Sequence, residues 1–317
     1  MLSRSATKSP QRLINRLRPP LAPAGIPGLV PALRAYSGFR VPEVRAERTS
    51  GTLASLGSLE VRLAHNAADV RRAQKVRYRV FYQERAAIAD AKTMLARRDV
   101  DAFDAICDHL LVVDHAATWH QPRKPNVVGT YRMLRHDVAR RHGGFYSAGE
   151  FDMAAMFASH RDLSFLEVGR SCVLPAYRNK RTIELLWTGL ADYVARHRLD
   201  VLFGCASLDG IDPDELALPL SFLHHYAVAP AGWNARALPH RYVEMNRMPK
   251  EAIDCKAAWR ALPPLIKGYL RLGGFVGEGA VADRQFGTTD VLVIVPMARM
   301  NPRYLAHFGL TGHVQAA

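Results

Sequence analysis

The stretch over residues 165–182 restricts the fold more than any other part of the sequence. It begins as an apolar, strand-like run, turns at Pro175, and passes through a basic loop into a helical pattern. Such a loop presents backbone N–H groups and the positive end of the helix dipole to a phosphate. Arg178, Lys180 and Arg181 add full positive charges there. The stretch therefore fits a phosphate-bearing ligand, and the alternative is a basic loop that is simply solvated.

The rest of the chain alternates strand-like and helical patterns without an internal repeat. We predict helices over residues 68–85, 182–196 and 214–226, and strands over residues 59–64, 109–114, 126–134, 165–173, 200–206, 275–281 and 290–295. This order predicts an α+β fold, with a central mixed sheet flanked by helices. We expect one folded domain over residues 51–300, a basic tail over residues 1–50, and a C-terminal extension over residues 301–317.

Two charged residues interrupt the apolar run. Glu167 and Arg170 are three apart, so on a regular strand they point to opposite faces unless the strand bulges between them. A bulge would also free backbone N–H groups near Arg170, which suits stabilisation of an oxyanion. The alternative is that Glu167 only pairs with a neighbouring arginine.

The charge balance narrows the choice of partners. Lys and Arg number 43 against 29 Asp and Glu, a formal net charge of +14. This surplus favours an acidic partner: nucleic acid, an anionic membrane or an acidic carrier protein. We expect no nucleic-acid partner, because the basic residues are spread along the chain and no recognised motif is present. The apolar runs are too short for a membrane-spanning helix.

The tail over residues 1–50 has its own character. No acidic residue precedes Glu43, and five prolines between residues 19 and 31 interrupt any long helix. We expect a disordered arm that makes peripheral contact with an anionic membrane. Plain disorder and an organellar transit peptide are the alternatives.

The four cysteines indicate neither a disulfide framework nor a zinc site. They are far apart and form no C-x-x-C pair, so we expect a reducing, cytoplasmic setting and no metal. Cys172 lies in an apolar run and is expected to be a buried structural residue. His224 and His225 lie in an apolar helical segment and are weak candidates for catalysis.

The same stretch resembles the central motif of the GNAT superfamily, V-x-P-x-x-[QR]-x-x-G-x-[GA]. Val173, Pro175 and Arg178 match, but Arg181 and Ile183 replace the two small residues. The resemblance implies an acyl donor carried on pantetheine, held near Val173, Arg178, Lys180 and Arg181. Larger side chains at the small positions favour a donor with one phosphate, and acidic acyl carrier protein suits the net charge.

A second resemblance is to the acyl-homoserine-lactone synthases. The residues that carry it, in chain order, are Arg77, Asp101, Asp104, Arg132, Glu167 and Arg170. Residues 59–296 resemble the bacterial L-ornithine Nα-acyltransferases of ornithine-lipid synthesis, through long runs such as 167–187, 203–207, 218–226 and 263–291. This resemblance implies transfer of a (3-hydroxy) fatty acyl group from acyl carrier protein to the α-amino group of ornithine. We expect a cytoplasmic protein, with peripheral contact of its basic tail at the inner face of the bacterial membrane.

The resemblance also implies roles for residues. Glu167 is the candidate general base, and Arg170 or Arg132 would bind the carboxylate of the amino acid. Arg77, Asp101 and Asp104 are further candidate substrate-binding residues, and the two aspartates would hold the distal ammonium. Their alternative role is to pin the loop after the first helix through Arg77. No cofactor is expected to stay bound, since acyl carrier protein thioester is a co-substrate. Another amino acid or small amine is the alternative acceptor.

Overall fold

A computed structural model describes residues 51–85, 87–116 and 126–300. Its strands are β1 (Thr52–Leu56), β2 (Leu59–Leu63), β3 (Asp108–Asp114), β4 (Asn126–Arg135), β5 (Phe151–Asp152), β6 (Phe165–Val173), β7 (Val201–Asp209), β8 (Arg236–Ala237), β9 (Tyr242–Val243), β10 (Phe275–Val276), β11 (Ala280–Asp283) and β12 (Thr288–Pro296). Its α-helices are α2 (Ala67–Tyr78), α3 (Ala91–Ala96), α4 (His136–Arg141), α5 (Ala154–Ser159), α6 (Lys180–His197), α7 (Ala217–Tyr226), α8 (Cys255–Ala261) and α9 (Pro264–Arg271).

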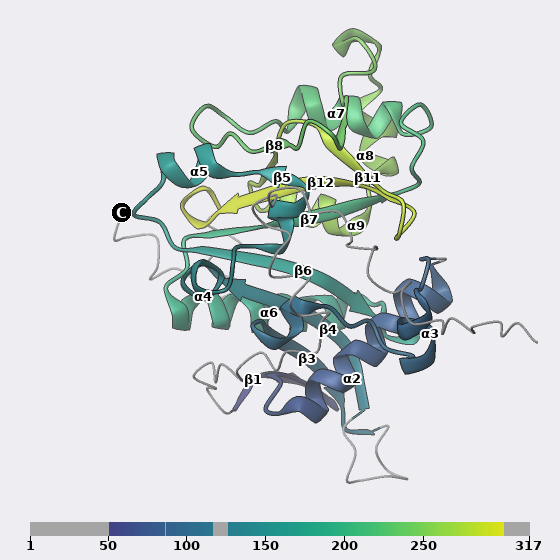
Figure 1. The fold of residues 1–317 in the computed structure, drawn as a ribbon, viewed down its shortest axis with the longest axis vertical. Helices are drawn as coiled ribbons and strands as arrows, with labels where there is room; N and C mark the ends of the chain where they lie inside the picture. Colours follow the sequence, from purple (N-terminus) through teal and green to yellow (C-terminus); the bar gives the residue numbers. More distant parts are fainter. Residues whose placement is uncertain (1–50, 86, 117–125, 301–317) are drawn as a thin grey trace, which may run out of the picture.

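One large sheet runs through the molecule, in the order β1-β2-β3-β4-β6-β7-β12-β11-β9, with β10 also paired to β12. Its pairs are antiparallel except β6 and β7, which run parallel, so the predicted mixed sheet is confirmed. In Figure 1 β1, β3 and β4 lie in the lower part of the view, β6 crosses its middle, and α7 and α8 lie towards the top; the short strands β5 and β8 pair separately above β6.

Several predicted elements differ in detail from the observed ones. The helix expected over residues 68–85 is α2 followed by a π-helical turn at Arg79–Glu84. The strand expected over residues 275–281 is split into β10 and β11, because Gly279 adopts a φ of 76° between them. The helix expected from residue 214 begins at Ala217. The tail and the C-terminal extension lie outside the described residues.

Helices α2 and α6 cover opposite faces of the N-terminal half of the sheet. Helix α2 packs Ala73 and Val76 against Leu111 and Val113 of β3, whereas α6 packs apolar side chains such as Leu190 against the other face. Each helix begins at an asparagine whose side chain accepts backbone N–H groups, Asn66 for α2 and Asn179 for α6. No helix in the described ranges is long and apolar enough to cross a bilayer.

The parallel strands β6 and β7 separate after a short stretch of pairing. Their register runs over three residue pairs, from Phe165–Val201 to Glu167–Phe203, although each strand has nine residues. Gly204 follows the last pair, and a Cβ there would lie 2.1 Å from the backbone oxygen of Val168. The backbones of the two strands therefore lie close together at Gly204, and their pairing ends at Glu167–Phe203.

We predict that Gly204→Ala destabilises the protein by about 1–3 kcal/mol, because the new methyl group overpacks against backbone that has little room to shift. Thermal unfolding would measure the change. Gly169→Ala on the facing strand is the matched control, since a Cβ there meets no atom within 4 Å. An alanine at 204 that unfolds at the same temperature as the control would show that the strands are not held this closely.

Candidate active site

The gap between β6 and β7 holds a cavity of about 670 Å³. Side chains alternate along a strand, so neighbouring residues of one strand reach opposite faces of the sheet. The cavity is lined by such neighbours, Tyr131 and Arg132 of β4, and Cys205 and Ala206 of β7. It therefore passes through the gap from one face of the sheet to the other.

The two faces of the cavity differ in chemistry. One face, the polar wall, consists of Arg132, Tyr146, Ser147, Glu167, Arg170, Cys205, Ser207, Asp283, Thr288 and Asp290. The other, the apolar wall, consists of Tyr131, Val168, Trp187, Ala206, Leu265, Tyr269 and Leu272. Such a cavity accepts a ligand with a charged part and a long apolar part.

Strand β6 has a bulge at Arg170 and Ser171, next to the stretch between Glu167 and Arg170 where the sequence allowed either a regular strand or a bulge. Thr130 pairs with Cys172 and Arg132 pairs with Gly169, so two residues of β6 stand opposite one of β4. Arg170 takes a φ of 50°, which is unusual for a residue with a side chain. The extra residue turns the Arg170 side chain to the wall that holds Glu167, and both contact Tyr146.

Glu167 is almost fully buried, and its carboxylate faces a helical turn. Its two oxygens accept the backbone N–H groups of Tyr146, at 2.9 Å, and of Ser147, at 2.6 Å. Burial raises the pKa of Glu167, although these hydrogen bonds favour the charged form. A carboxylate with a raised pKa on a cavity wall is suited to accept a proton. Within the described part of the chain its hydrogen bonds come from Tyr146 and Ser147, including the Ser147 side chain, and not from the neighbouring arginines.

Behind the polar wall lies a network of three arginines and three aspartates. Arg77 contacts Asp99 and Asp104 at 2.7 Å each. Arg132 contacts Asp101 at 2.6 Å and Asp104 at 3.3 Å. Arg170 completes it, at 3.3 Å from Asp99 and 3.4 Å from Asp101. The positive and negative charges match in number, so the network satisfies itself without a ligand.

This network bears on the roles expected for its members. Arg77 is fully buried, and neither it nor Asp101 or Asp104 lines the cavity. Burial would raise the pKa of Asp104, but Arg77 and Arg132 hold it well below its usual range. These contacts fit the alternative role, pinning the loop after the first helix, and ornithine binding by these three residues stays a prediction. Asp99 was missed by sequence reasoning.

Three other carboxylates lie close together, two of them in the polar wall. The acid cluster, Glu150, Asp283 and Asp290, has ligand oxygens within 4.8 Å of one another. Burial, with Asp290 nearby, raises the pKa of Glu150 to about 7, and burial also raises the pKa of Asp290. Arg241 contacts Glu150 at 3.4 Å. Like charges this close favour a cation, either a metal ion or an ammonium group.

Sequence reasoning did not single out the acid cluster as a site. Asp290 is the one charged residue of the buried strand β12, and such an isolated charge is a usable signal. The glycine-rich stretch before Asp290 borders the cavity, because Asp283, Phe286 and Thr288 line it. The expectation that no metal binds stays a prediction.

The apolar wall carries a pair of tyrosines from distant parts of the chain. The hydroxyl groups of Tyr131, on β4, and Tyr269, on α9, contact each other. Burial raises the pKa of Tyr131 to about 12, so its hydroxyl stays protonated. Burial likewise raises the pKa of Cys172 to about 12, which agrees with the structural role expected for that thiol.

The basic loop before α6 borders the cavity, but its charges are partly paired. Arg178 forms a two-pronged contact with Glu84 and donates from Nε to the backbone oxygen of Val173 at 2.9 Å. Lys180 lies 3.4 Å from Glu184 and is mostly exposed. Arg181 is exposed as well. Phosphate or carrier binding by this loop stays a prediction.

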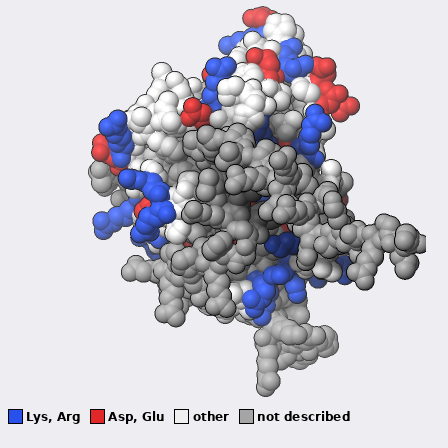
Figure 2. Space-filling model, viewed as in Figure 1, with Lys and Arg blue, Asp and Glu red and all other residues white. Residues whose placement is uncertain are grey.

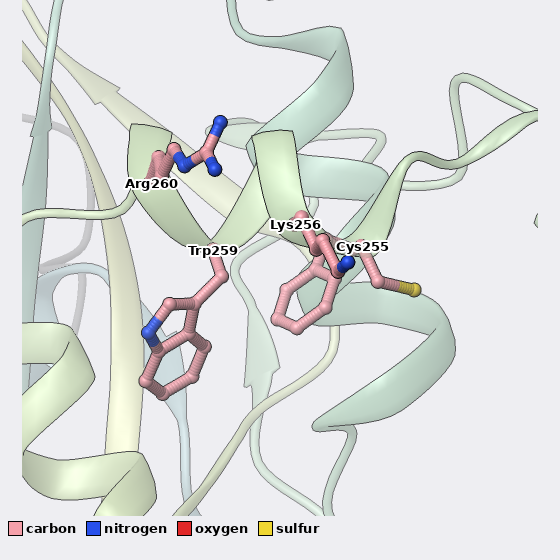
Figure 3. Close-up of a pocket in the computed structure, with 5 residues that line it drawn as sticks. Cys255, Lys256, Trp259 and Arg260 are labelled. Atoms are coloured by element: carbon pink, nitrogen blue, oxygen red, sulfur yellow. The ribbon is translucent and has the colours of Figure 1, made fainter.

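A second hollow, of about 390 Å³, lies between α7 and α8 and shares no lining residue with the cavity. Figure 3 shows Lys256, Trp259 and Arg260 on α8 around it. His225 of α7 contacts the backbone oxygen of Met248 at 3.0 Å. Neither His224 nor His225 lines the cavity or the second hollow, so the structure gives no support for a catalytic role of these histidines.

Comparisons with known proteins show what this chain is similar to. A family model described as an acetyltransferase (GNAT) domain matches residues 76–188. An L-ornithine N(alpha)-acyltransferase from Brucella abortus is 51% identical over 257 residues, covering 81% of this chain and 91% of that protein. One from Agrobacterium fabrum is 49% identical, covering 83% and 89%. Among solved structures, an N-acyl amino acid synthase from uncultured soil microbes is 10% identical, with a TM-score of 0.41, and covers 78% of this chain and 94% of that one.

We predict that Glu167→Gln lowers the rate of acyl transfer to an amine by roughly 10²- to 10⁴-fold, because the amide keeps the shape but cannot accept the proton. Steady-state kinetics would measure the rate, and circular dichroism would check the fold. Glu184→Gln, at the rim of the cavity, is the control and should retain activity. Unchanged turnover in the Glu167 variant would remove this residue from the role of base.

Proposed function

We propose an acyl donor and an acceptor for this chain, which belongs to the family of L-ornithine N(alpha)-acyltransferases and is an acyltransferase. It takes a fatty acyl group from acyl carrier protein and transfers it to the α-amino group of ornithine. One observation supports the proposal most strongly, the cavity between β6 and β7 with its polar and apolar walls. The polar wall suits a small amino acid with an additional positive charge. The apolar wall suits the acyl chain of the donor.

The polar wall offers a partner for each charged group of ornithine. Arg170 is the better candidate for the carboxylate, because it contacts its aspartates at longer distances than Arg132 does. Its guanidinium lies between the rings of Tyr146 and Phe286, 4.9 and 4.8 Å from their centres, which fixes its orientation. The side-chain ammonium would lie at Asp283 and Asp290, which face the cavity.

This arrangement accounts for acylation at the α-amino group. An amine attacks a thioester only when it is neutral, and a model α-amino group has a pKa of about 8 against about 10.4 for a side-chain ammonium. An ammonium held by the acid cluster stays charged and does not react. Glu167 would accept the proton of the α-amino group, directly or through water. The bulge at Arg170 would supply a backbone N–H to the oxyanion.

The donor loop is consistent with a carrier protein. Arg181 and Ile183 occupy positions where small residues would let the backbone wrap round a pyrophosphate. Lys180 and Arg181 are exposed beside the cavity, and the chain carries a net charge of +14. An acidic carrier with a single phosphate on its pantetheine suits both features.

We predict that the enzyme prefers ornithine over norvaline, which lacks only the side-chain amine, by on the order of 100-fold in kcat/KM, and that Asp290→Asn removes most of this preference. Competition assays with acyl carrier protein thioester would measure both, with glutamine, lysine and glycine as further acceptors. Asp209→Asn is the control, since this carboxylate is exposed at the end of β7. An Asp290 variant that discriminates as well as the wild type would place the ammonium elsewhere.

We predict that replacing Lys180 and Arg181 with glutamine raises the KM for acyl carrier protein thioester about tenfold at low salt, and that the difference shrinks as salt rises. The kcat should stay unchanged, since neither side chain reaches the reacting atoms. Lys256→Gln with Arg260→Gln on α8 is the matched control. Equal use of acyl-coenzyme A without any salt effect would contradict the carrier protein as donor while leaving acylation of ornithine intact.

A further inference from the structure

The most exposed large apolar side chains of the described residues gather in one short segment. Leu95 is 89% exposed, Ile88 68% and Met94 58%. All three lie within residues 87–98, which we call the α3 segment because it contains helix α3. Side chains of this kind seldom remain in water without a purpose, and when clustered they mark a contact surface.

The α3 segment carries a net positive charge. Lys92 and Arg97 are exposed, and Arg98 donates to the side chain of Gln74 at 3.2 Å. The acidic residue of the segment, Asp90, accepts the backbone N–H of Thr93 at 2.6 Å as the N-cap of α3. Aliphatic side chains flanked by Lys and Arg are typical of elements that enter an anionic lipid interface.

We infer that the α3 segment contacts an anionic lipid bilayer, with Ile88, Met94 and Leu95 entering the interface and the neighbouring cations meeting lipid headgroups. The segment presents protruding side chains, and none of its residues lines either hollow. A bilayer needs no matching groove, whereas a protein partner relies on shape complementarity. In Figure 2 most of the visible Asp and Glu side chains lie at the end of the molecule that carries α7, where Lys and Arg side chains lie among them.

The position of the segment connects this surface to the cavity. Val80, Phe81 and Arg85, which directly precede it, line the cavity. The backbone N–H of Ile88 donates to the backbone oxygen of Gln285 at 2.7 Å, which ties the segment to the C-terminal half. A bilayer here lies beside the rim through which an acylated, amphiphilic product leaves. Only this last point rests on the proposed acyl transfer.

The test is binding of the full chain to vesicles of phosphatidylcholine and phosphatidylglycerol in equal amounts, compared with pure phosphatidylcholine. Leu95→Ser should weaken binding to the anionic vesicles about tenfold, because one buried leucine side chain is lost. Lys92→Gln with Arg97→Gln should weaken it about twentyfold, because each cation near such a surface contributes about fivefold. Activity on soluble substrates should be unchanged in both variants.

The matched controls lie elsewhere on the surface. Ile211→Ser removes an exposed aliphatic side chain, and Lys256→Gln with Arg260→Gln removes two cations from α8. Both should bind vesicles as the wild type does. Equal binding by test and control variants would overturn the inference. So would a loss of carrier-protein-dependent turnover, or of self-association, in the α3 variants while vesicle binding is retained.

Discussion

The short pairing between β6 and β7 is the constraint on which the rest of the structure depends. Three residue pairs join the strands, and the close approach at Gly204 ends that contact. Beyond Gly204 the two strands are not paired, and the cavity with its polar and apolar walls lies in the gap between them. The gap opens both faces of the sheet to one ligand. A polar acceptor on one face can therefore meet an apolar acyl chain on the other face.

The buried charges divide into two groups with different chemistry. In the arginine–aspartate network each charge has a partner, and breaking such a network costs stability because it leaves an unpaired buried charge. In the acid cluster the carboxylates outnumber their cation, Arg241, and the pKa values of Glu150 and Asp290 rise. The network supports the wall, and the cluster is where a positively charged group would be stabilised.

Local signals predicted most of the fold. Residues 165–182 were predicted as strand, turn and helix because apolar alternation, Pro175 and helical spacing all act within a few residues, and the structure follows them. The acid cluster is different in kind. It forms only when the turn before β5 brings Glu150 to β11 and β12, more than 130 residues later, and no local pattern encodes that approach. The π-helical turn at Arg79–Glu84 was missed because its apolar spacing over six residues resembles that of an α-helix.

The contact between Tyr131 and Tyr269 has a consequence for how such a protein diversifies. Along the described strands of the main sheet the two halves share only the three β6–β7 pairs, so we expect the width of the gap further along to depend on side chains that meet across it, such as these two tyrosines. Substitutions at these positions would change the size of the cavity without breaking a backbone hydrogen bond of the sheet. The capacity for different acyl chains can therefore evolve separately from the backbone pairing that holds the domain together.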